Sequence, residues 1–170
     1  MKKSGLEMAL ILHDIRSAHN VGAIFRTADA AGVAKIYLTG YTSAPVGRFG
    51  RINKQIAKTA LGAEQNILWE KRDNIFDLIY HLKPNTCLVA LEQSPDSVDY
   101  KTLRSHPTSD VKDAPTSDVS IVVILGNEVS GLDPEILKQC DIIAEIPMRG
   151  KKESLNVAMA AGIFLFRLLD

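Results

Sequence analysis

Cysteine is scarce in this sequence, and its two thiols follow no recognisable pattern. Cys87 and Cys140 lie far apart and form no Cys-x-x-Cys pair, so neither a disulfide framework nor a zinc site is indicated. Long apolar runs are missing as well. The run from Met8 to Leu12 is too short for a signal peptide, and nothing approaches the ~18 residues of a membrane span. These absences predict a cytoplasmic, reduced protein with no membrane partner.

The chain has no excess of charge of either sign. Its 20 Lys and Arg residues balance 20 Asp and Glu residues, so any nucleic-acid or membrane partner must meet a local patch. At 170 residues, with 46% hydrophobic and 24% charged residues, the composition is typical of a globular chain and not of a disordered one. We expect one domain over residues 1–170, with no additional RNA-binding domain.

Several common chemical signatures are also missing. No Gly-x-Gly-x-x-Gly follows the first apolar run, and no P-loop motif occurs, which disfavours dinucleotide and P-loop nucleotide binding. Ser130 stands in Glu-Val-Ser-Gly, which is not the Gly-x-Ser-x-Gly of a nucleophile elbow. The four histidines share no metal-ligand spacing, so we predict no metal site.

What is present is an alternation of strand-like and helical stretches. Apolar residues from Val21 to Ala28 recur at the spacing of a helix with one buried face, which Ser17 could cap and Gly32 could end. Further helices are predicted at Asn53–Leu61, Ile75–Leu82, Pro134–Gln139 and Leu155–Leu169. Strands are predicted at Met8–Leu12, Lys35–Thr39, Asn66–Trp69, Cys87–Leu91, Ile121–Leu125 and Ile142–Ile146. Because strands that alternate with helices form parallel βαβ units, the class is α/β: a mostly parallel sheet with helices on both faces.

The last predicted helix is apolar on nearly all sides. Arg167 is its only charge before the terminal Asp170. A helix of this kind must be covered all round, and a sheet covers one face only. We therefore predict a homodimer with this helix in the interface.

A polar stretch between the predicted strands repeats the letters PTSDV. The two copies stand at Pro107–Val111 and Pro115–Val119. We interpret them as a small tandem duplication in a solvent loop.

Three segments place polar residues after the ends of predicted strands: His13–Gly32, Ile124–Leu137 and Glu145–Gly162. In an α/β sheet, ligands bind beyond the carboxyl ends of the strands, so these segments could share one site. Each has a simpler interpretation. Asn20 could only cap a helix, Glu128 could only lie at a helix start, and Ser154 could only be an N-cap. Three such coincidences together favour a site.

The letters of these segments resemble a known family. NxxxxxRTxDAxG, GNExxGL and IPMxGxxxSLNVxxAxGI are similar to the three motifs of the SpoU/TrmH-type RNA ribose 2′-O-methyltransferases of the SPOUT class, over about Leu10 to Leu169. The segment KTALGAE at Lys58–Glu64 also resembles sequences of this family. The resemblance implies an α/β fold with a deep C-terminal trefoil knot, a homodimer, and S-adenosylmethionine as cofactor for methylation of tRNA or rRNA.

Residue by residue, the resemblance implies two sets of site residues. The catalytic set is Asn20, Arg26, Glu128, Ser154 and Asn156. The cofactor-binding set is Leu91, Gly126, Asn127, Ile146, Met148, Ser154 and Leu155. The absence of side chains at Gly126 and Gly150 would let the main chain approach the cofactor closely.

The resemblance places Arg26 at the reacting hydroxyl. Because arginine keeps its proton below pH ~12, we expect Arg26 to stabilise the developing alkoxide and to hold the neighbouring phosphate, whose oxygen takes the proton. We expect Asn20 to orient Arg26 and the ribose.

Basic residues gather in two places, which we predict to bind RNA. The first cluster, free of acidic residues, is Arg48, Arg51, Lys54 and Lys58. The second, beside the third motif, is Arg149, Lys151 and Lys152. A solvated helix face and loop is the other interpretation.

Two alternatives to the methyltransferase remain at this stage. One is a non-catalytic RNA- or cofactor-binding homodimer of the same fold. The other is an ordinary α/β nucleotide-binding enzyme, which requires the motif matches to be accidental.

Overall fold

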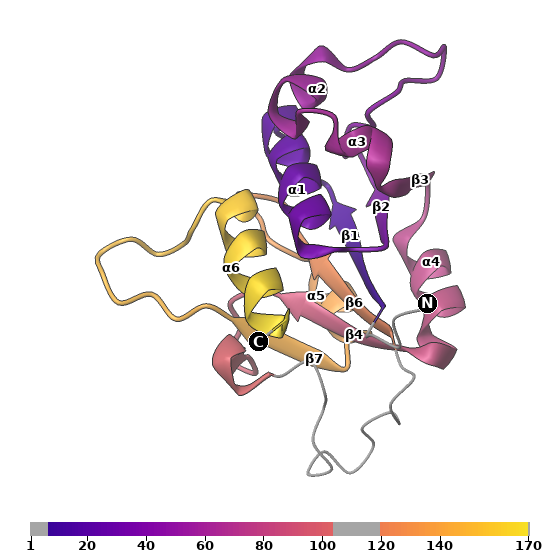
Figure 1. The fold of residues 1–170 in the computed structure, drawn as a ribbon. Coiled ribbons are helices and arrows are strands. Elements are labelled where there is room, and N and C mark those ends of the chain that lie inside the picture. Colours follow the sequence, from indigo (N-terminus) through magenta and orange to yellow (C-terminus); the bar gives the residue numbers. More distant parts are fainter. Residues whose placement is uncertain (1–6, 104–119, 170) are drawn as a thin grey trace.

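A computed structural model describes residues 7–103 and 120–169, and the duplicated PTSDV segment lies outside the described residues. Over these residues the chain forms a sheet of seven parallel strands in the order β3-β2-β1-β6-β4-β7-β5 (Figure 1). The strands are β1 Met8–His13, β2 Lys35–Thr39, β3 Leu68–Arg72, β4 Thr86–Leu91, β5 Val98–Asp99, β6 Ser120–Leu125 and β7 Ile142–Glu145. The predicted parallel α/β class is confirmed.

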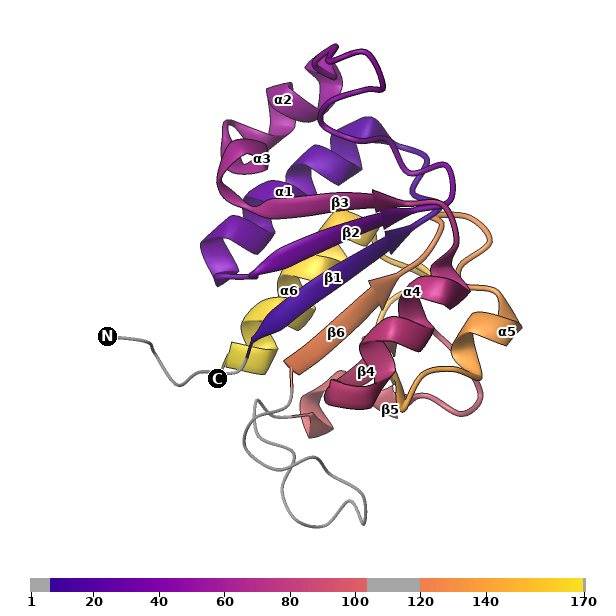
Figure 2. The same cartoon turned by 90° about the vertical axis from the view of Figure 1, so that its right-hand side faces the viewer.

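Helices cover both faces of the sheet, as predicted (Figure 2). One face carries α1 Ala18–Ala31, α2 Lys54–Ala60, α3 Ala63–Asn66 and α6 Val157–Leu169, and the other carries α4 Ile75–Leu82 and α5 Pro134–Leu137. Two short 3₁₀ turns, Lys83–Asn85 and Tyr100–Thr102, complete the described elements.

The central strands divide their side chains between two cores. In β1, Leu10 and Leu12 pack with α1 and α6, whereas Ile11 packs on the other face with α4 and α5. In β6, Val123 and Ile124 divide in the same way. Because both faces are covered, these strands are apolar at almost every position, which is why the sequence marks them clearly.

Several predicted boundaries need correction. The third strand is Leu68–Arg72 and not Asn66–Trp69, because helix α3 occupies Ala63–Asn66. This edge strand is mostly exposed and polar, so it lacks the apolar signal of the central strands. The last helix begins at Val157 and not at Leu155. The helix predicted at Pro134–Gln139 ends at Leu137, and the strand predicted to Ile146 ends at Glu145.

Helix α1 is fixed at both ends and along its length. Ser17 caps it by accepting a hydrogen bond from the Asn20 N–H, and Gly32 ends it in the left-handed region, both as predicted. At Gly22 a Cβ atom would collide with Thr59 and the Ile56 carbonyl of α2. The Thr59 hydroxyl also donates to the His19 carbonyl at 3.0 Å, so the KTALGAE segment holds α2 against α1.

Helix α6 buries one side and exposes the other. Phe164, Leu165 and Leu168 are buried in the core, whereas Met159 and Phe166 are 62% and 48% exposed. Despite its apolar character, α6 is short. Among the helices of residues 7–103 and 120–169, none combines the length and the hydropathy needed to cross a membrane.

Candidate active site

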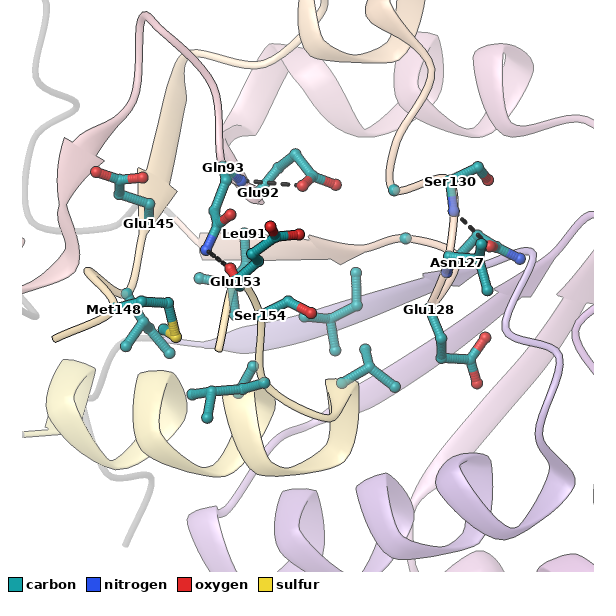
Figure 3. A pocket seen from close by; sticks show the side chains of 18 residues that line it. Leu91, Glu92, Gln93, Asn127, Glu128, Ser130, Glu145, Met148, Glu153 and Ser154 are labelled. Atoms are coloured by element: carbon teal, nitrogen blue, oxygen red, sulfur yellow. Dashed lines mark hydrogen bonds between the residues drawn. The ribbon is translucent and has the colours of Figure 1, made fainter. Parts of the chain in front are cut away.

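A cavity of about 330 Å³ opens beyond the carboxyl ends of β4, β6 and β7 (Figure 3). This volume falls within the range of about 300–1,000 Å³ that is usual for small-molecule sites. In Figure 3, Glu145 and Met148 lie at one end and Glu128 at the other, with Ser154 between them. The lining includes all the residues of the expected cofactor-binding set: Leu91, Gly126, Asn127, Ile146, Met148, Ser154 and Leu155.

Glu128 is the centre of a hydrogen-bonded cluster at one end of this cavity. Its carboxylate accepts the backbone N–H groups of Arg16 at 2.9 Å and Ser17 at 3.1 Å. It also accepts the Asn20 side-chain amide at 2.9 Å. These partners lie just before and within the first turn of α1, so the carboxylate also meets the positive end of that helix.

Asn156 extends the cluster to the third motif. Its Nδ2 donates to the Asn20 side-chain oxygen at 3.1 Å, while its own oxygen accepts the Ala158 N–H at 2.9 Å and so caps α6. Ser17 and Asn156 are therefore the caps of α1 and α6. The simpler interpretations of Asn20 and Ser154 as helix caps are wrong, and Glu128, Asn20 and Asn156 form a continuous chain across the three motifs.

Glu128 remains ionised at neutral pH. Partial burial acts to raise the pKa of its carboxyl group, but the hydrogen bonds from Arg16, Asn20 and Ser17 outweigh burial and hold the pKa below its usual value. A carboxylate of lowered pKa is a firm hydrogen-bond acceptor and a poor base. Its chemical role here is to orient its donors.

Asn127 shapes the loop that carries Glu128. Its Nδ2 donates to the Asp14 carbonyl at 3.0 Å and to the Tyr41 hydroxyl, and its Oδ1 accepts the N–H groups of Val129 and Ser130 at 2.8 Å each. The side chain is 9% exposed. Because these bonds occupy both ends of the amide, the Asn127 side chain holds its own loop in place at the cavity.

Two residues that the sequence analysis missed hold the other cavity loops. The Glu92 carboxylate accepts the Leu132 N–H at 2.9 Å, and the Gln93 amide donates to the Glu153 carbonyl at 2.8 Å. Both follow the end of β4 directly. The rule that ligands bind beyond strand ends, applied to β4 as well as to β6 and β7, would have found them.

The two glycines that were expected beside the cofactor differ in their surroundings. A Cβ atom at Gly126 would meet Leu132 at 2.7 Å and the Gly131 carbonyl carbon at 2.8 Å, so this glycine permits close packing of its own loop. A Cβ atom at Gly150 would meet nothing within 4 Å. A close approach of the main chain to the cofactor at these glycines stays a prediction.

The structure does not bring Arg26 into the cluster. Arg26 follows Asn20 by six positions on α1, a rotation of about 240° around the helix. Its exposed side chain lines a second cavity between α1, α2 and α6, together with Lys58 and Phe166. Within one chain, Asn20 bonds to Glu128 and Asn156 and does not orient Arg26.

The two basic clusters are exposed and lie on different elements. Arg48 and Arg51 stand in the loop after β2, and Lys54 and Lys58 on α2. The residues Arg149, Lys151 and Lys152 lie in the loop after β7, between the cavity-lining residues Met148 and Glu153.

The cavity itself is acidic. Four glutamates line it, Glu92, Glu128, Glu145 and Glu153, and its lining residues, all in the described part of the chain, include no Lys or Arg. Carboxylates beside an apolar wall of Leu91 and Ile146 suit an organic cation better than a phosphate ester. Over residues 7–103 and 120–169, no three His, Cys, Asp or Glu side chains gather where they could hold a metal ion.

A parallel sheet with a ligand-sized cavity beyond its strand ends defines an α/β protein with a small-molecule site. Residues 7–166 match the SpoU rRNA Methylase family, and the chain belongs to that family. The family resemblance of the motifs is confirmed.

Similar proteins support the same assignment. A Staphylococcus aureus protein assigned to the TrmH family of tRNA/rRNA methyltransferases is 29% identical over 167 residues, which are 98% of this chain and 60% of that protein. An AdoMet-bound rRNA methyltransferase from Sinorhizobium meliloti is 29% identical with a TM-score of 0.79, over 95% of this chain and 55% of that one. A TrmH/SpoU tRNA modifying enzyme from A. aeolicus is 28% identical with a TM-score of 0.77, over 95% and 73%. The chain therefore spans less than two thirds of the first two relatives.

Proposed function

We propose that this chain binds S-adenosylmethionine in the acidic cavity and transfers its methyl group to a ribose 2′-hydroxyl of tRNA or rRNA. The observation that carries the proposal is the hydrogen-bonded chain Glu128–Asn20–Asn156, which joins the three family motifs at the edge of that cavity. The AdoMet-bound relative from Sinorhizobium meliloti supports the choice of cofactor.

The cavity residues fit this cofactor by charge and by shape. When bound, S-adenosylmethionine supplies a methyl group on a positively charged sulfur, and the leaving group is a neutral thioether. The glutamates that line the cavity favour its positive charges. Leu91, Ile146, Met148 and Leu155 offer apolar surface to its adenine, and backbone groups at Gly126 and Asn127 offer hydrogen bonds to the adenine edge.

Titration calorimetry tests the binding step. We expect S-adenosylmethionine to bind at one molecule per chain and at least tenfold more tightly than ATP or NAD, because the acidic lining repels phosphates. Equal or tighter binding of ATP or NAD would contradict the proposal and favour an ordinary nucleotide-binding enzyme.

The residues of this chain must then align the ribose and manage its hydroxyl proton. The guanidinium of Arg26 donates hydrogen bonds to the developing alkoxide and to a neighbouring phosphate oxygen, which takes the proton of the ribose hydroxyl. Ser154, which lines the cavity, and Asn20 hold the ribose. Since no leaving-group acid is needed, orientation and charge stabilisation are the whole contribution of these side chains.

We propose that a second copy of the chain completes this site. Met159, Ile163 and Phe166 form an exposed apolar stripe at i, i+4 and i+7 on α6, and the Arg26 cavity adjoins Phe166. A partner that covers the stripe also meets Arg26. In a two-fold dimer this arrangement can bring Arg26 of one subunit to the Glu128 cluster of the other.

Charge reversal of the stripe tests this interface. We expect Phe166→Asp to convert a dimer into a monomer in sedimentation experiments and to abolish methyl transfer, because it buries a carboxylate against an apolar surface. Tyr80→Asp, at an aromatic side chain that is 79% exposed on α4, is the matched control and should change neither property. A wild-type protein that is monomeric and active would contradict the dimer.

We further propose that the chain is knotted near its C-terminus. The segment 146–156 is held on one side by the Gln93–Glu153 bond and on the other by the Asn20–Asn156 bond, and these attachments support the family's knotted arrangement. A crystal structure in which the C-terminal segment passes through no loop of the backbone would contradict the knot.

A further inference from the structure

The loop between β2 and α2 forms a small, well-bonded hairpin, which we call the 45–53 hairpin. Val46 and Ile52 pair across it in an antiparallel bridge. The Gly47 N–H donates to the Arg51 carbonyl at 2.9 Å, and the Gly50 N–H donates to the Gly47 carbonyl at 2.9 Å. The second bond closes a four-residue turn, with Gly50 at a positive φ of 70°. The tip is thus a defined structure.

This turn presents an aromatic ring to solvent between two arginines. Phe49, at the tip, is 93% exposed, more than any other large apolar side chain of the described residues. Arg48 and Arg51 flank it and are also exposed. From Gly40 to Ala63 the chain contains no Asp or Glu, so the field around Phe49 is positive. An aromatic face among unpaired cations is the surface chemistry that binds a base and its phosphates.

The loop that carries the 45–53 hairpin begins at the same edge of the sheet as the loops of the acidic cavity. In Figure 2 the loop before α2 and the loop after β6 both leave the ends of the strand arrows. Tyr41, at the start of the β2–α2 loop, contacts the Asn127 side chain through its hydroxyl. One RNA strand can therefore reach both the cavity and the hairpin.

We propose that Phe49 stacks on an unpaired base of the RNA substrate while Arg48 and Arg51 contact neighbouring phosphates. The inference rests on the proposed RNA methyltransferase function and deepens it by naming the feature of the RNA that is recognised. The base is unpaired because a ring can stack on a base face only where the duplex stack is open. The charge pattern favours RNA, because the arginines on either side of the ring can neutralise the phosphates next to a stacked base.

Binding of a mixed-sequence 20-nucleotide single-stranded RNA tests the stacking. We expect Phe49→Ala to weaken binding about 5- to 100-fold, and Phe49→Trp to retain it, because any aromatic face supports stacking. Phe49→Ala should leave the salt dependence of binding unchanged, whereas the double variant Arg48→Ala/Arg51→Ala should lower its slope by about 1.4. Duplex RNA of the same length should show little effect of Phe49→Ala.

Two controls separate this inference from its alternatives. Tyr80→Ala removes another exposed aromatic ring, far from the hairpin on α4, and should leave RNA binding unchanged; an equal loss in both variants would overturn the inference. A change in sedimentation of Phe49→Ala would show that the hairpin joins two copies of the chain, and would overturn it too. Intact S-adenosylmethionine binding with RNA affinity insensitive to Phe49 refutes the stacking alone, whereas failure to bind S-adenosylmethionine refutes the proposed function.

Discussion

Replacing Arg26 by alanine is expected to lower kcat for RNA methylation by about 10²- to 10³-fold while leaving the affinity for S-adenosylmethionine within about twofold. The expected decrease in kcat follows from the loss of one charged hydrogen-bond donor to a developing oxyanion. Cofactor affinity should persist because Arg26 lines the cavity beside Phe166 and not the acidic cavity. Single-turnover methylation and calorimetry measure the two quantities.

Arg26→Lys distinguishes the proposed role from a general need for positive charge. Lysine keeps the charge but loses the planar fork that can contact alkoxide and phosphate together, so we expect a loss of kcat nearly as large as with alanine. A lysine variant with near-normal kcat and intact cofactor binding would show that the fork is not needed.

Mixed dimers report which subunit supplies Arg26. If Arg26 of one subunit serves the Glu128 cluster of the other, co-expressed Arg26→Ala and Glu128→Gln chains form some dimers with one intact site. About one quarter of wild-type activity should then return under random pairing. If both residues act within one chain, every site carries a lesion and no activity returns.

Glu128→Gln is expected to affect both folding and catalysis. The substitution replaces one acceptor oxygen by a donor amide facing the donors Arg16, Ser17 and Asn20. An unsatisfied, partly buried donor costs about 1–3 kcal/mol, so the free energy of unfolding should fall by that amount at pH 7. Because the same carboxylate orients Asn20, we also expect kcat to fall more than tenfold.

The stability difference should depend on pH in a defined direction. The folded-state pKa of Glu128 is lowered, so its contribution is fully present above the unfolded pKa of about 4.3 and is lost as the pH falls through the folded value. Urea unfolding of wild type and variant should therefore differ most near pH 7, and the difference should shrink as the pH falls through the lowered pKa of Glu128.

Glu135→Gln is the matched control for this substitution. Glu135 forms an exposed ion pair with Lys138 three positions later, and such pairs contribute little to stability. Its removal should change the free energy of unfolding by less than about 0.5 kcal/mol. Equal destabilisation by Glu128→Gln and Glu135→Gln would contradict the central position of Glu128.

The sequence predicted the buried part of this fold well because burial leaves a composition signal. β1, β2 and β6 were placed within a residue at each end, and the α1 caps Ser17 and Gly32 are those expected. The edge strands gave no such signal. β3 is mostly polar and exposed, and its predicted start overlapped helix α3. β5 has only two residues, Val98–Asp99.

The candidate site divides along a similar line. Gly126 and Ile146, which the family resemblance assigned to the cofactor, directly follow β6 and β7 and line the cavity. The hydrogen bonds of loop side chains could not be predicted from the sequence. The Asn127 side chain, for example, bonds to the Asp14 carbonyl, the Tyr41 hydroxyl and an N–H group of its own loop. Arg26 lies six positions after Asn20 on α1 and so faces another direction, which a match of motif letters alone does not show.

The central claim is that the cavity delivers a methyl group to a ribose oxygen, and the position of that group in the product tests it most directly. The protein is incubated with methyl-labelled S-adenosylmethionine and tRNA or rRNA, and the product is hydrolysed in alkali. A 2′-O-methyl group blocks cleavage at the adjacent phosphodiester, so the account predicts label in alkali-resistant dinucleotides, and none with Arg26→Ala. Label in mononucleotides would place the methyl group on a base and contradict the account.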